Sequence, residues 1–459
     1  MPGRLALIVL ATGAGAWFVV ATSSDVPNVA RSSGSTGCVS ETGTADACED
    51  GTALENALGV AASADGRSVY VASDVSDAVA IFERDRATGG LTQQAAPAGC
   101  VSETATGGAC SDGRGLNAPN GLGMSVDGKS VYAASIGSDA VAIFDRDPVR
   151  GALTPKAGTA GCISEPAPRR ACRRGRALNG AFDLAVSPDG ENVYVAAQLS
   201  DAVAIFERDP ATGALSQKAG TAGCISETGT GGVCEDGTAL DGVVSVAVSS
   251  EGRSVYAAST NSDAVAIFDR DPSTGALTQK AGTSACISET GTGGVCHDGM
   301  GLDSAAGVAV SGDGASVYVA SQLSDAVAVF DRDPAAGALS QKAGAAACVS
   351  ETGTGPCRDG RALNGAIGIA VSPDGRTVYV ASTASDAIAI FTRRRTGGLR
   401  QLRGSAGCVS ETGRGPCRDG VALDFARDLA LSPDGKSVYI ASARSDAVAI
   451  LPTSASPRR

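Results

Sequence analysis

The chain has 459 residues, a formal net charge of −12 and only 4% aromatic residues. A net negative charge of this size argues against nucleic acid or an anionic membrane as the main partner, because both repel an acidic protein. Length alone would suggest about three domains, but an internal repeat favours a single domain.

Residues 1–21 have the pattern of a secretory signal peptide. Arg4 supplies the positive start, Leu5–Val20 is apolar, and Val19-Val20-Ala21 fits a small-residue cleavage site. The apolar run also borders on the length that spans a bilayer, so an uncleaved membrane anchor is the alternative. Since no second such stretch follows, we expect a secreted or cell-envelope protein without a membrane span after cleavage.

Residues 22–452 contain seven repeats of about sixty residues. Each repeat begins at a cysteine, with steps of 62, 62, 62, 62, 62 and 60 residues, and a fixed period of this size is typical of repeat folds. In the third full repeat, four strands are predicted over residues 184–190, 192–197, 202–206 and 214–217. Four strands in each of seven repeats predict an all-β, seven-bladed β-propeller, with residues 453–459 as a flexible tail.

The last repeat lacks its fourth strand at the C-terminal end. Counting back from the first cysteine of each repeat aligns residues 29–32 with residues 215–218. We therefore expect the N-terminal segment Val26–Ser33 to add the outer strand of the last blade. Such a closure removes open sheet edges, which otherwise invite aggregation.

The 14 cysteines occur as one close pair in each repeat. An even number at regular local spacing in an exported chain predicts disulfides, with pairing between blades as the alternative. A zinc site would need closer cysteine pairs or histidines, and His297 is the single histidine of the chain. The predicted local pairs are Cys38–Cys48, Cys100–Cys110, Cys162–Cys172, Cys224–Cys234, Cys286–Cys296, Cys348–Cys357 and Cys408–Cys417.

Strand order places the loops on two faces of the propeller. The cysteine loops join each outer strand to the next inner strand, so they should share a face with turns such as Leu199-Ser200-Asp201. The Pro-Asp-Gly turns, which carry a turn signal, and the Asp-Arg-Asp-Pro turns should lie on the opposite face.

Stretches such as residues 371–382 (VSPDGRTVYVAS) resemble the YVTN surface-layer repeats, and residues 206–215 (FERDPATGAL) resemble the lactonase-like group of seven-bladed propellers. That group includes 6-phosphogluconolactonase-like and carboxymuconate cyclase-like proteins. The resemblance covers residues 38–451 and rests on motifs that build blades, so it bears on the fold more than on the chemistry. It implies a site in the central channel built from histidine, arginine and acidic side chains.

No histidine stands where the resemblance implies one, just before each inner strand. The matching positions and those that follow them are mainly apolar or small, with four polar exceptions: Asn120, Asp183, Arg427 and Asp428. An arginine near two aspartates could hold an anion or orient water for acyl chemistry. The simpler interpretation is ordinary ion pairing at a solvated channel rim.

Three further patterns suggest ligands less directly. The Asp145-Arg146-Asp147 type of pair precedes a glycine, but a hairpin turn explains it better than calcium does. Each cysteine loop carries a glutamate such as Glu227, which could join a weak cation-binding ring or accept backbone N–H groups of its own loop. His297 has no evident partner. We expect no metal and no cofactor.

The cysteine loop of the third repeat is basic and could dock an anionic polymer or a partner protein. The alternative is that these arginines are solvated surface residues that arose by sequence drift and have no docking role. The patch consists of Arg169, Arg170, Arg173, Arg174 and Arg176.

Two functions remain open. The favoured one is a disulfide-stabilised scaffold that binds an unknown protein, polymer or small-molecule ligand, since the blades are nearly identical and catalytic side chains are few. The alternative is a lactonase-like hydrolase or cycloisomerase acting in the central channel. We expect a monomer.

Overall fold

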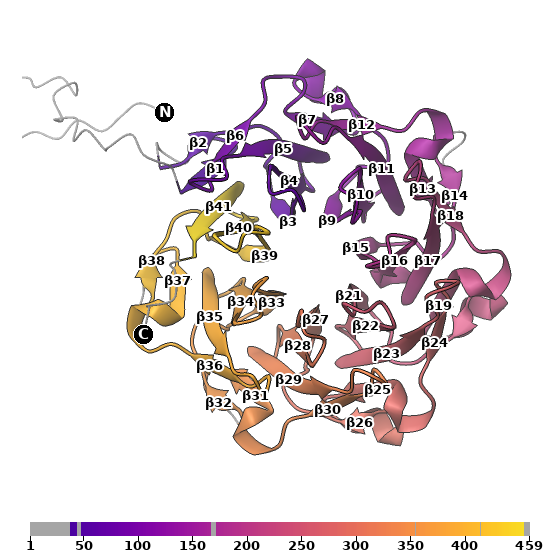
Figure 1. Ribbon diagram of the computed structural model, residues 1–459, viewed down its shortest axis with the longest axis vertical. Helices are drawn as coiled ribbons and strands as arrows, with labels where there is room; N and C mark the ends of the chain where they lie inside the picture. The colour runs from indigo at the N-terminus through magenta and orange to yellow at the C-terminus, as the bar shows by residue number, and fades with distance from the viewer. Residues whose placement is uncertain (1–36, 44–46, 167–170, 354, 414, 454–459) are drawn as a thin grey trace, which may run out of the picture. The chain divides into compact units, whose positions relative to one another are not determined.

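Each repeat folds into one β-sheet in the computed structural model, and the strands of the described residues form seven sheets arranged in a ring (Figure 1). The structure describes residues 37–43, 47–166, 171–353, 355–413 and 415–453. The expected signal peptide, the segment Val26–Ser33 and the tail after residue 453 lie outside these residues. The predicted seven-bladed all-β propeller is confirmed.

Three long strands make the inner part of every blade, because small and β-branched residues suit sheets covered on both faces. The inner strands are β3 (Ala57–Ala62), β9 (Pro119–Met124), β15 (Ala181–Val186), β21 (Val243–Val248), β27 (Ala305–Val310), β33 (Ala366–Val371) and β39 (Ala426–Leu431). The second strands are β4 (Ser68–Ser73), β10 (Ser130–Ser135), β16 (Asn192–Ala197), β22 (Ser254–Ser259), β28 (Ser316–Ser321), β34 (Thr377–Ser382) and β40 (Ser437–Ser442). The third strands are β5 (Ala78–Arg84), β11 (Ala140–Arg146), β17 (Ala202–Arg208), β23 (Ala264–Arg270), β29 (Ala326–Arg332), β35 (Ala387–Arg393) and β41 (Ala447–Pro452).

The fourth position of a blade is divided between two strands of three residues. In the third blade, β18 (Leu215–Gln217) and β19 (Cys224–Ser226) both pair with β17, which is long enough to hold the two end to end. The strands before the cysteines are β6 (Leu91–Gln93), β12 (Leu153–Pro155), β18, β24 (Leu277–Gln279), β30 (Leu339–Gln341) and β36 (Leu399–Gln401). Those at the cysteines are β1 (Cys38–Ser40), β7 (Cys100–Ser102), β13 (Cys162–Ser164), β19, β25 (Cys286–Ser288), β31 (Cys348–Ser350) and β37 (Cys408–Ser410).

A two-residue strand then pairs in parallel with each cysteine strand at the rim, and short 3-10 turns connect the outer pieces. These strands are β2 (Glu49–Asp50), β8 (Ser111–Asp112), β14 (Arg173–Arg174), β20 (Glu235–Asp236), β26 (His297–Asp298), β32 (Arg358–Asp359) and β38 (Arg418–Asp419). The turns are η1 (Ala105–Gly108), η2 (Gly158–Gly161), η3 (Gln198–Ser200), η4 (Gly220–Gly223), η5 (Gly229–Gly232), η6 (Gly282–Ala285), η7 (Gly291–Gly294), η8 (Gly344–Ala346) and η9 (Gly404–Gly407).

An N-terminal strand closes the last blade, as predicted. Strand β1 pairs antiparallel with β41, and the sheet order is β2-β1-β41-β40-β39. Strand β1 occupies only the cysteine half of the outer position. Within the described part of the chain, the other half is a cavity of about 320 Å³ lined by Gly37, Val421 and Leu451 among others. A buried leucine such as Leu215 fills the matching place in the other six blades.

The seven predicted local disulfides form, and each joins Cα atoms 4.7–4.8 Å apart. In each pair the first cysteine starts a cysteine strand and the second directly precedes the rim strand. The bond therefore holds this short parallel pair together at the edge of the blade. A closed loop of about ten residues of this kind stabilises a fold by about 2–3 kcal/mol through the unfolded state.

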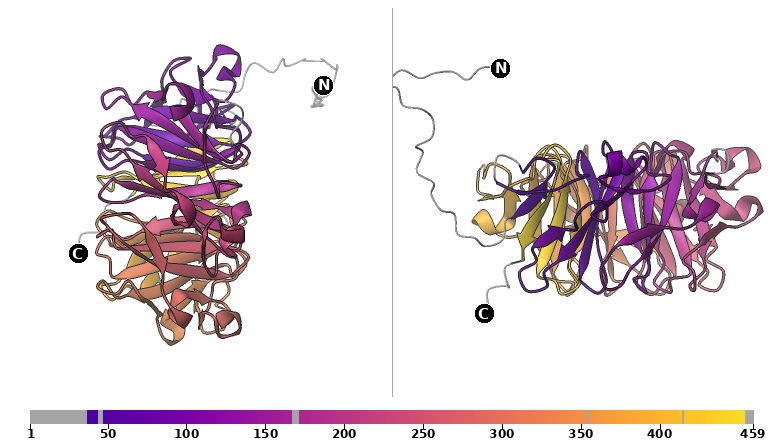
Figure 2. Two further views of the ribbon diagram at one scale, coloured as in Figure 1. Left: turned by 90° about the vertical axis from the view of Figure 1, so that its right-hand side faces the viewer. Right: turned by 90° about the horizontal axis from the view of Figure 1, so that it is seen from above.

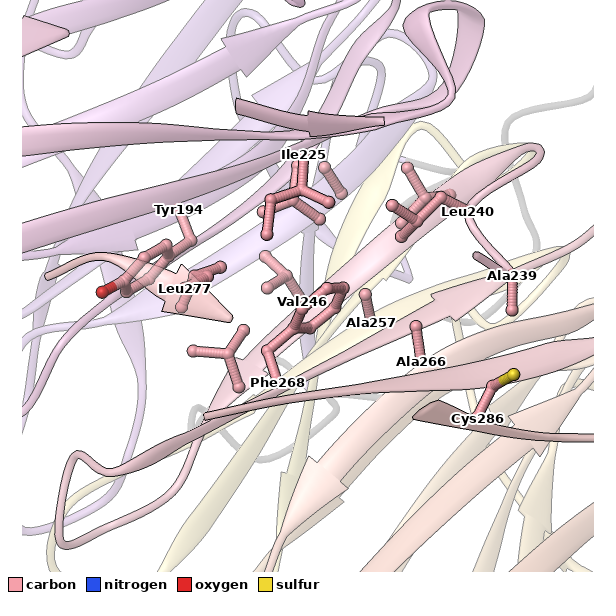
Figure 3. Packing of buried hydrophobic residues seen from close by; sticks show 14 of the residues in the cluster. Tyr194, Ile225, Ala239, Leu240, Val246, Ala257, Ala266, Phe268, Leu277 and Cys286 are labelled. Atoms are coloured by element: carbon pink, nitrogen blue, oxygen red, sulfur yellow. The ribbon is translucent and has the colours of Figure 1, made fainter. Parts of the chain in front are cut away.

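The hydrophobic core lies between adjacent blades. Figure 3 shows one such interface, where Tyr194 from the third blade packs near Val246 and Phe268 of the fourth. Six of the seven repeat tyrosines are 0% exposed, and so are most of the repeat phenylalanines. These rings pack between blades and are therefore not free to stack on a ligand.

A buried arginine ties neighbouring blades at one face. Arg270 of the fourth blade donates from Nε to the Tyr194 hydroxyl at 2.6 Å and forms an ion pair with Asp189 of the third blade at 2.6 Å. The Tyr194 hydroxyl in turn donates to the carbonyl of Gly275 at 2.9 Å. We call this set the arginine latch. Equivalent latches use Arg84, Arg146, Arg208, Arg332 and Arg393.

The opposite face carries the cysteine loops, as predicted. The Glu227 backbone N–H donates to the Asp201 carbonyl at 3.0 Å, which places that loop beside the turn between the second and third strands. The Glu227 carboxylate accepts the N–H of Leu240 at 2.5 Å. Every sibling glutamate accepts the matching leucine N–H. The loop glutamates therefore order their own loops. Figure 2 shows the propeller edge-on, with the strands running between these two faces.

Candidate site in the central channel

All seven inner strands carry a β-bulge near their first residue, and this bulge shapes the channel. In β15 the pairing with β16 skips Phe182, and in β39 the pairing with β40 skips Arg427. The same break occurs at Asn120. A bulge interrupts the alternation of side chains between two faces and re-aims the extra residue. As a result, the neighbours Arg427 and Asp428 both line the channel.

The residue after each bulge controls how closely two inner strands approach. Where it is glycine, a side chain has no room: a Cβ on Gly59 would lie 1.9 Å from the Asn120 carbonyl oxygen, and one on Gly368 would lie 2.5 Å from that of Arg427. Where it is aspartate, the carboxylate bridges to the next blade. Asp183 and Asp428 are therefore also spacers between blades.

Each of the two aspartates accepts two backbone N–H groups. Asp428 accepts from Val60 of the first blade at 2.9 Å and from Leu429 at 2.8 Å. Asp183 accepts from Val246 of the fourth blade at 3.2 Å and from Leu184 at 2.7 Å. The Asp183 carboxylate also has a side-chain hydrogen bond with Ser245, which acts to lower its pKa.

Burial makes both carboxyls weaker acids than an ordinary aspartate. Burial, together with the charge of Asp183, raises the pKa of Asp428 to about 7, against the opposing effects of the Val60 and Leu429 N–H groups and of Arg427. Burial raises the pKa of Asp183 to about 6. Both side chains are partly exposed, yet only to a narrow channel enclosed by protein, so desolvation still acts strongly on them. Groups that titrate near neutral pH can exchange protons with a substrate.

Arg427 crosses the channel. Its guanidinium lies 5.6 Å from the ring centre of Phe182, which belongs to the third blade, while Arg427 belongs to the seventh. Burial lowers its pKa, and the carboxylates of Asp74 and Asp428 oppose that shift. Among the residues that the structure describes, the Arg427 side chain makes neither an ion pair nor a hydrogen bond.

Asn120 supplies an unused donor. Its side chain is 6% exposed, and its Nδ2 has no hydrogen-bond partner among the residues that the structure describes. An unsatisfied buried amide costs about 1–3 kcal/mol. Because Nδ2 itself is buried, it reaches a ligand oxygen in the cavity only when the Asn120 side chain turns toward that space.

The structure brings the four predicted channel residues into one cavity. Asn120, Asp183, Arg427 and Asp428 all line a space of about 190 Å³ together with Phe182 and Ser245. No hydrogen bond joins any two of the four side chains in the described chain. They surround a shared space, in which Asp183 and Asp428 interact through their charges across the channel.

The basic loop patch is only partly described. Arg169 and Arg170 lie outside the described residues. Arg176 donates to the carbonyls of Lys218 and Gly220, and Arg173 donates to that of Leu215. These two arginines bind the backbone of the neighbouring outer strand, and Arg174 is exposed.

The other sequence candidates have local explanations. Asp147 accepts the N–H groups of Val149 and Arg150, as a hairpin turn requires. His297 is exposed on β26, with Thr283 3.5 Å from its Nε2. In the part of the chain that the structure describes, no group of three histidine, cysteine or acidic side chains is arranged to hold a metal ion. Nor does that part contain a helix long and apolar enough to cross a membrane.

Sequence reasoning missed two contributors to the site. Phe182 was assigned no role, although it is the surface on which Arg427 rests. Asp74 lies in the turn after β4 and acts on Arg427 through its charge. Both belong to blades distant from Arg427 in sequence, so only the closed ring reveals their proximity. A weak signal existed for Phe182, since it departs from the two repeat positions that hold most aromatic residues.

The sheets form a seven-bladed β-propeller. Polar side chains line a small cavity on its central axis. The model of the family described as "Lactonase, 7-bladed beta-propeller" matches residues 11–163, 177–226 and 308–456 of this chain. The chain belongs to this family. No curated protein matched the chain.

Solved structures agree on the fold. A periplasmic gluconolactonase from Pseudomonas aeruginosa is 18% identical with a TM-score of 0.50, covering 75% of this chain and 83% of that one. The hydrazine synthase of Kuenenia stuttgartiensis is 16% identical with a TM-score of 0.53, covering 88% and 97%. A candidate 6-phosphogluconolactonase from Bacteroides uniformis is 19% identical with a TM-score of 0.50, covering 74% and 82%. At these identities the likeness concerns the fold alone.

Proposed function

We propose that the protein is a hydrolase of small lactones that acts in the central channel, outside the cytoplasm. The observation that carries this proposal is the pairing of two carboxyls of near-neutral pKa, Asp183 and Asp428, in one cavity with the unused donor of Asn120. The family supports the reaction class, and the seven disulfides support an oxidising compartment. The cavity is smaller than the usual ligand pocket of about 300–1,000 Å³, which favours a single-ring substrate.

The residues have complementary roles in such a reaction. The Asp428 carboxylate takes a proton from water, and the resulting oxygen nucleophile bonds to the lactone carbonyl carbon. Asn120 Nδ2 donates to the carbonyl oxygen, where negative charge develops. When the ring C–O bond breaks, the proton on Asp428 passes to the departing ring oxygen. The product is a hydroxy acid, Asp428 is a carboxylate again, and Asp183 tunes its basicity through its charge.

The test is hydrolysis of a panel of single-ring lactones by the full chain, measured by acid release. We expect Asp428→Asn to lower kcat by about 100-fold or more, since a general base contributes about 10²–10⁴. For the wild type, kcat should rise with pH through about 7, where Asp428 becomes a carboxylate.

The control is Asp236→Asn, because Asp236 lies on the exposed rim strand β20. It should leave kcat unchanged. Turnover that survives in a folded Asp428→Asn variant would refute this role for the channel.

A binding scaffold is the second candidate, and one observation favours it. The oxygens of Asp183 and Asp428 already accept backbone N–H groups of adjacent blades, which is a structural task. If the folded and oxidised protein turns over no lactone in the panel, the binding scaffold becomes the favoured function. The appropriate measurement is then a pull-down from the extracytoplasmic fraction.

A further inference from the structure

The outer hairpin of the sixth blade concentrates positive charge. Residues 392–403, which end β35 and form β36, contain five arginines and no acidic residue. The matching segment of each of the first five blades contains two acidic residues, such as Asp331 and Asp333 in the fifth. Arg393 belongs to a latch and pairs with Asp313. The other four are exposed, and we call them the rim arginines: Arg394, Arg395, Arg400 and Arg403.

This hairpin lacks the ion pair that balances its counterparts. In the fourth blade, Lys280 pairs with Asp269 of the third strand at 2.6 Å, and the second, third and fifth blades have the same pair. Thr392 and Leu402 stand at these two positions in the sixth blade. The strand register places Arg400 opposite Thr392, and both side chains are exposed. Within the described chain, none of the rim arginine side chains forms an ion pair or a hydrogen bond.

The preceding cysteine loop adds two partly exposed guanidinium groups to the same strand. Arg358 donates from Nη1 to the Leu399 carbonyl at 3.1 Å, and Arg361 donates from Nη2 to the Leu402 carbonyl at 3.1 Å. Each bond ends on a neutral oxygen and so neutralises no charge, although the exposed Asp359 follows Arg358 in the chain. Figure 1 shows β36 at the outer rim of the ring, away from the central channel. The rim of the sixth blade is therefore basic in an otherwise acidic protein.

Protection of a sheet edge does not account for so many charges. A charged side chain on an edge strand discourages pairing with another chain, and lysine is a common choice. The other outer strands manage with less: strand β24 and the two residues after it carry one lysine, Lys280. Four arginines without acidic partners at one strand therefore point to a partner of opposite charge.

We propose that the rim arginines bind a polysaccharide whose sugars carry carboxylates. A guanidinium matches a carboxylate with two parallel N–H bonds, and a repeating polymer presents the same group to successive arginines. Arg400 and Arg403 are three residues apart, which is at most about 10 Å between their Cα atoms, so one polymer chain can reach both. Recognition by charge needs no aromatic stacking platform, which the buried rings do not offer.

Other anionic macromolecules fit this surface less well. Duplex DNA or an anionic membrane presents dense charge to much of a protein's surface, and the net charge of −12 opposes that approach. An acidic protein would need an interface with an apolar core. Leu402, 38% exposed, is the one large apolar side chain exposed in residues 392–403. A flexible sugar chain can follow the strand alone. This inference does not depend on the proposed hydrolysis, since the channel lies on the axis of the ring.

The test measures binding of the full chain to polygalacturonate by biolayer interferometry, with dextran as the uncharged polymer. We expect binding to polygalacturonate and not to dextran. A variant that combines Arg394→Gln, Arg395→Gln, Arg400→Gln and Arg403→Gln should bind about tenfold more weakly or worse, because each change removes charge-assisted contacts. Lysine at the same four positions should retain part of the affinity, since it keeps the charge and loses the fork.

Salt gives a second readout on the wild type. Raising the ionic strength from about 0.1 M to about 1 M shortens the Debye length from about 10 Å to about 3 Å, so contacts between exposed charges are screened. Binding to polygalacturonate should weaken over this range. An affinity that does not change with salt would contradict recognition by the rim arginines.

The matched control removes four exposed positive charges from other blades. It combines Arg67→Gln, Lys129→Gln, Arg253→Gln and Lys436→Gln, which share the position before the second strand and are all exposed. This variant should bind polygalacturonate as the wild type does. Equal loss in both variants would attribute binding to net charge and overturn the proposal, and so would no binding by the wild type. Tighter binding to duplex DNA, to vesicles with anionic lipid or to polyglutamate would also overturn it, and would assign the surface to that class of partner if the rim arginines are required.

Discussion

The carboxyl of Asp428 joins two blades and also lines the channel, and this double position makes stability depend on pH. Its pKa is about 7 in the folded protein, against an ordinary value of 3.8. Between these values the folded state holds a proton that the unfolded state has released. Stability therefore falls as the pH rises from about 4 to about 7.

Asp428→Asn should flatten this dependence, since an amide does not titrate. From pH 5 to pH 8 the wild type should lose on the order of 2 kcal/mol more stability than the variant, less than the full pKa shift implies because channel water reaches the carboxyl. Denaturant unfolding at the two pH values measures the difference. Parallel curves for the two proteins would show that Asp428 does not titrate in this range.

At the scale of elements, the cysteine loops depend on their glutamates as well as on their disulfides. Glu103 accepts the N–H of Leu116 at 2.6 Å, and Leu116 is 0% exposed. Glu103→Ala leaves that N–H without an acceptor in a buried place, which should cost about 1–3 kcal/mol.

The comparison for this change is Glu235→Ala on the exposed rim strand β20, expected within about 0.5 kcal/mol of the wild type. Thermal unfolding under non-reducing conditions measures both variants. Equal stabilities would mean that the disulfide alone orders the loop.

How far the sequence predicts an element depends on whether its determinants are local. The repeat period, the paired cysteines and the turn motifs are local, so the blades and disulfides followed from them. The division of the outer strand could not be predicted from local features, because the strand at Cys224 forms only when β17 offers a free edge. The bulge at Arg427 likewise arises from pairing between β39 and β40. The channel residues could still be found, because they depart from an otherwise regular repeat.

At the scale of the whole molecule, the contacts between neighbouring blades are less regular than the repeated sequence suggests. Each latch arginine reaches back to the preceding blade, from Arg84, which bonds Tyr439 of the seventh blade, to Arg393, which bonds Tyr318 of the fifth. Within the described residues, the junction of the sixth and seventh blades has no latch. Thr453 stands at the latch position there, and its hydroxyl donates to the Gly435 carbonyl at 2.6 Å.

Thr453→Arg should supply the missing latch. The backbone of Thr453 already has the latch geometry, since its N–H donates to the Lys436 carbonyl as that of Arg84 does to Arg67. The new guanidinium should reach the hydroxyl of Tyr379 and the carboxylate of Asp374 in the sixth blade. Hydrogen bonds to charged groups add about 1.5–3 kcal/mol, less the entropy of ordering a long side chain, so a gain of about 1 kcal/mol is expected.

A double-mutant cycle with Asp374→Ala distinguishes a latch from a general charge effect in this acidic protein. If the new arginine pairs with Asp374, the gain in Tm should shrink when that carboxylate is removed. Thr453→Lys should give little gain in Tm with or without Asp374, because an ammonium lacks the planar fork of a guanidinium. An equal gain from lysine and arginine would attribute the effect to net charge.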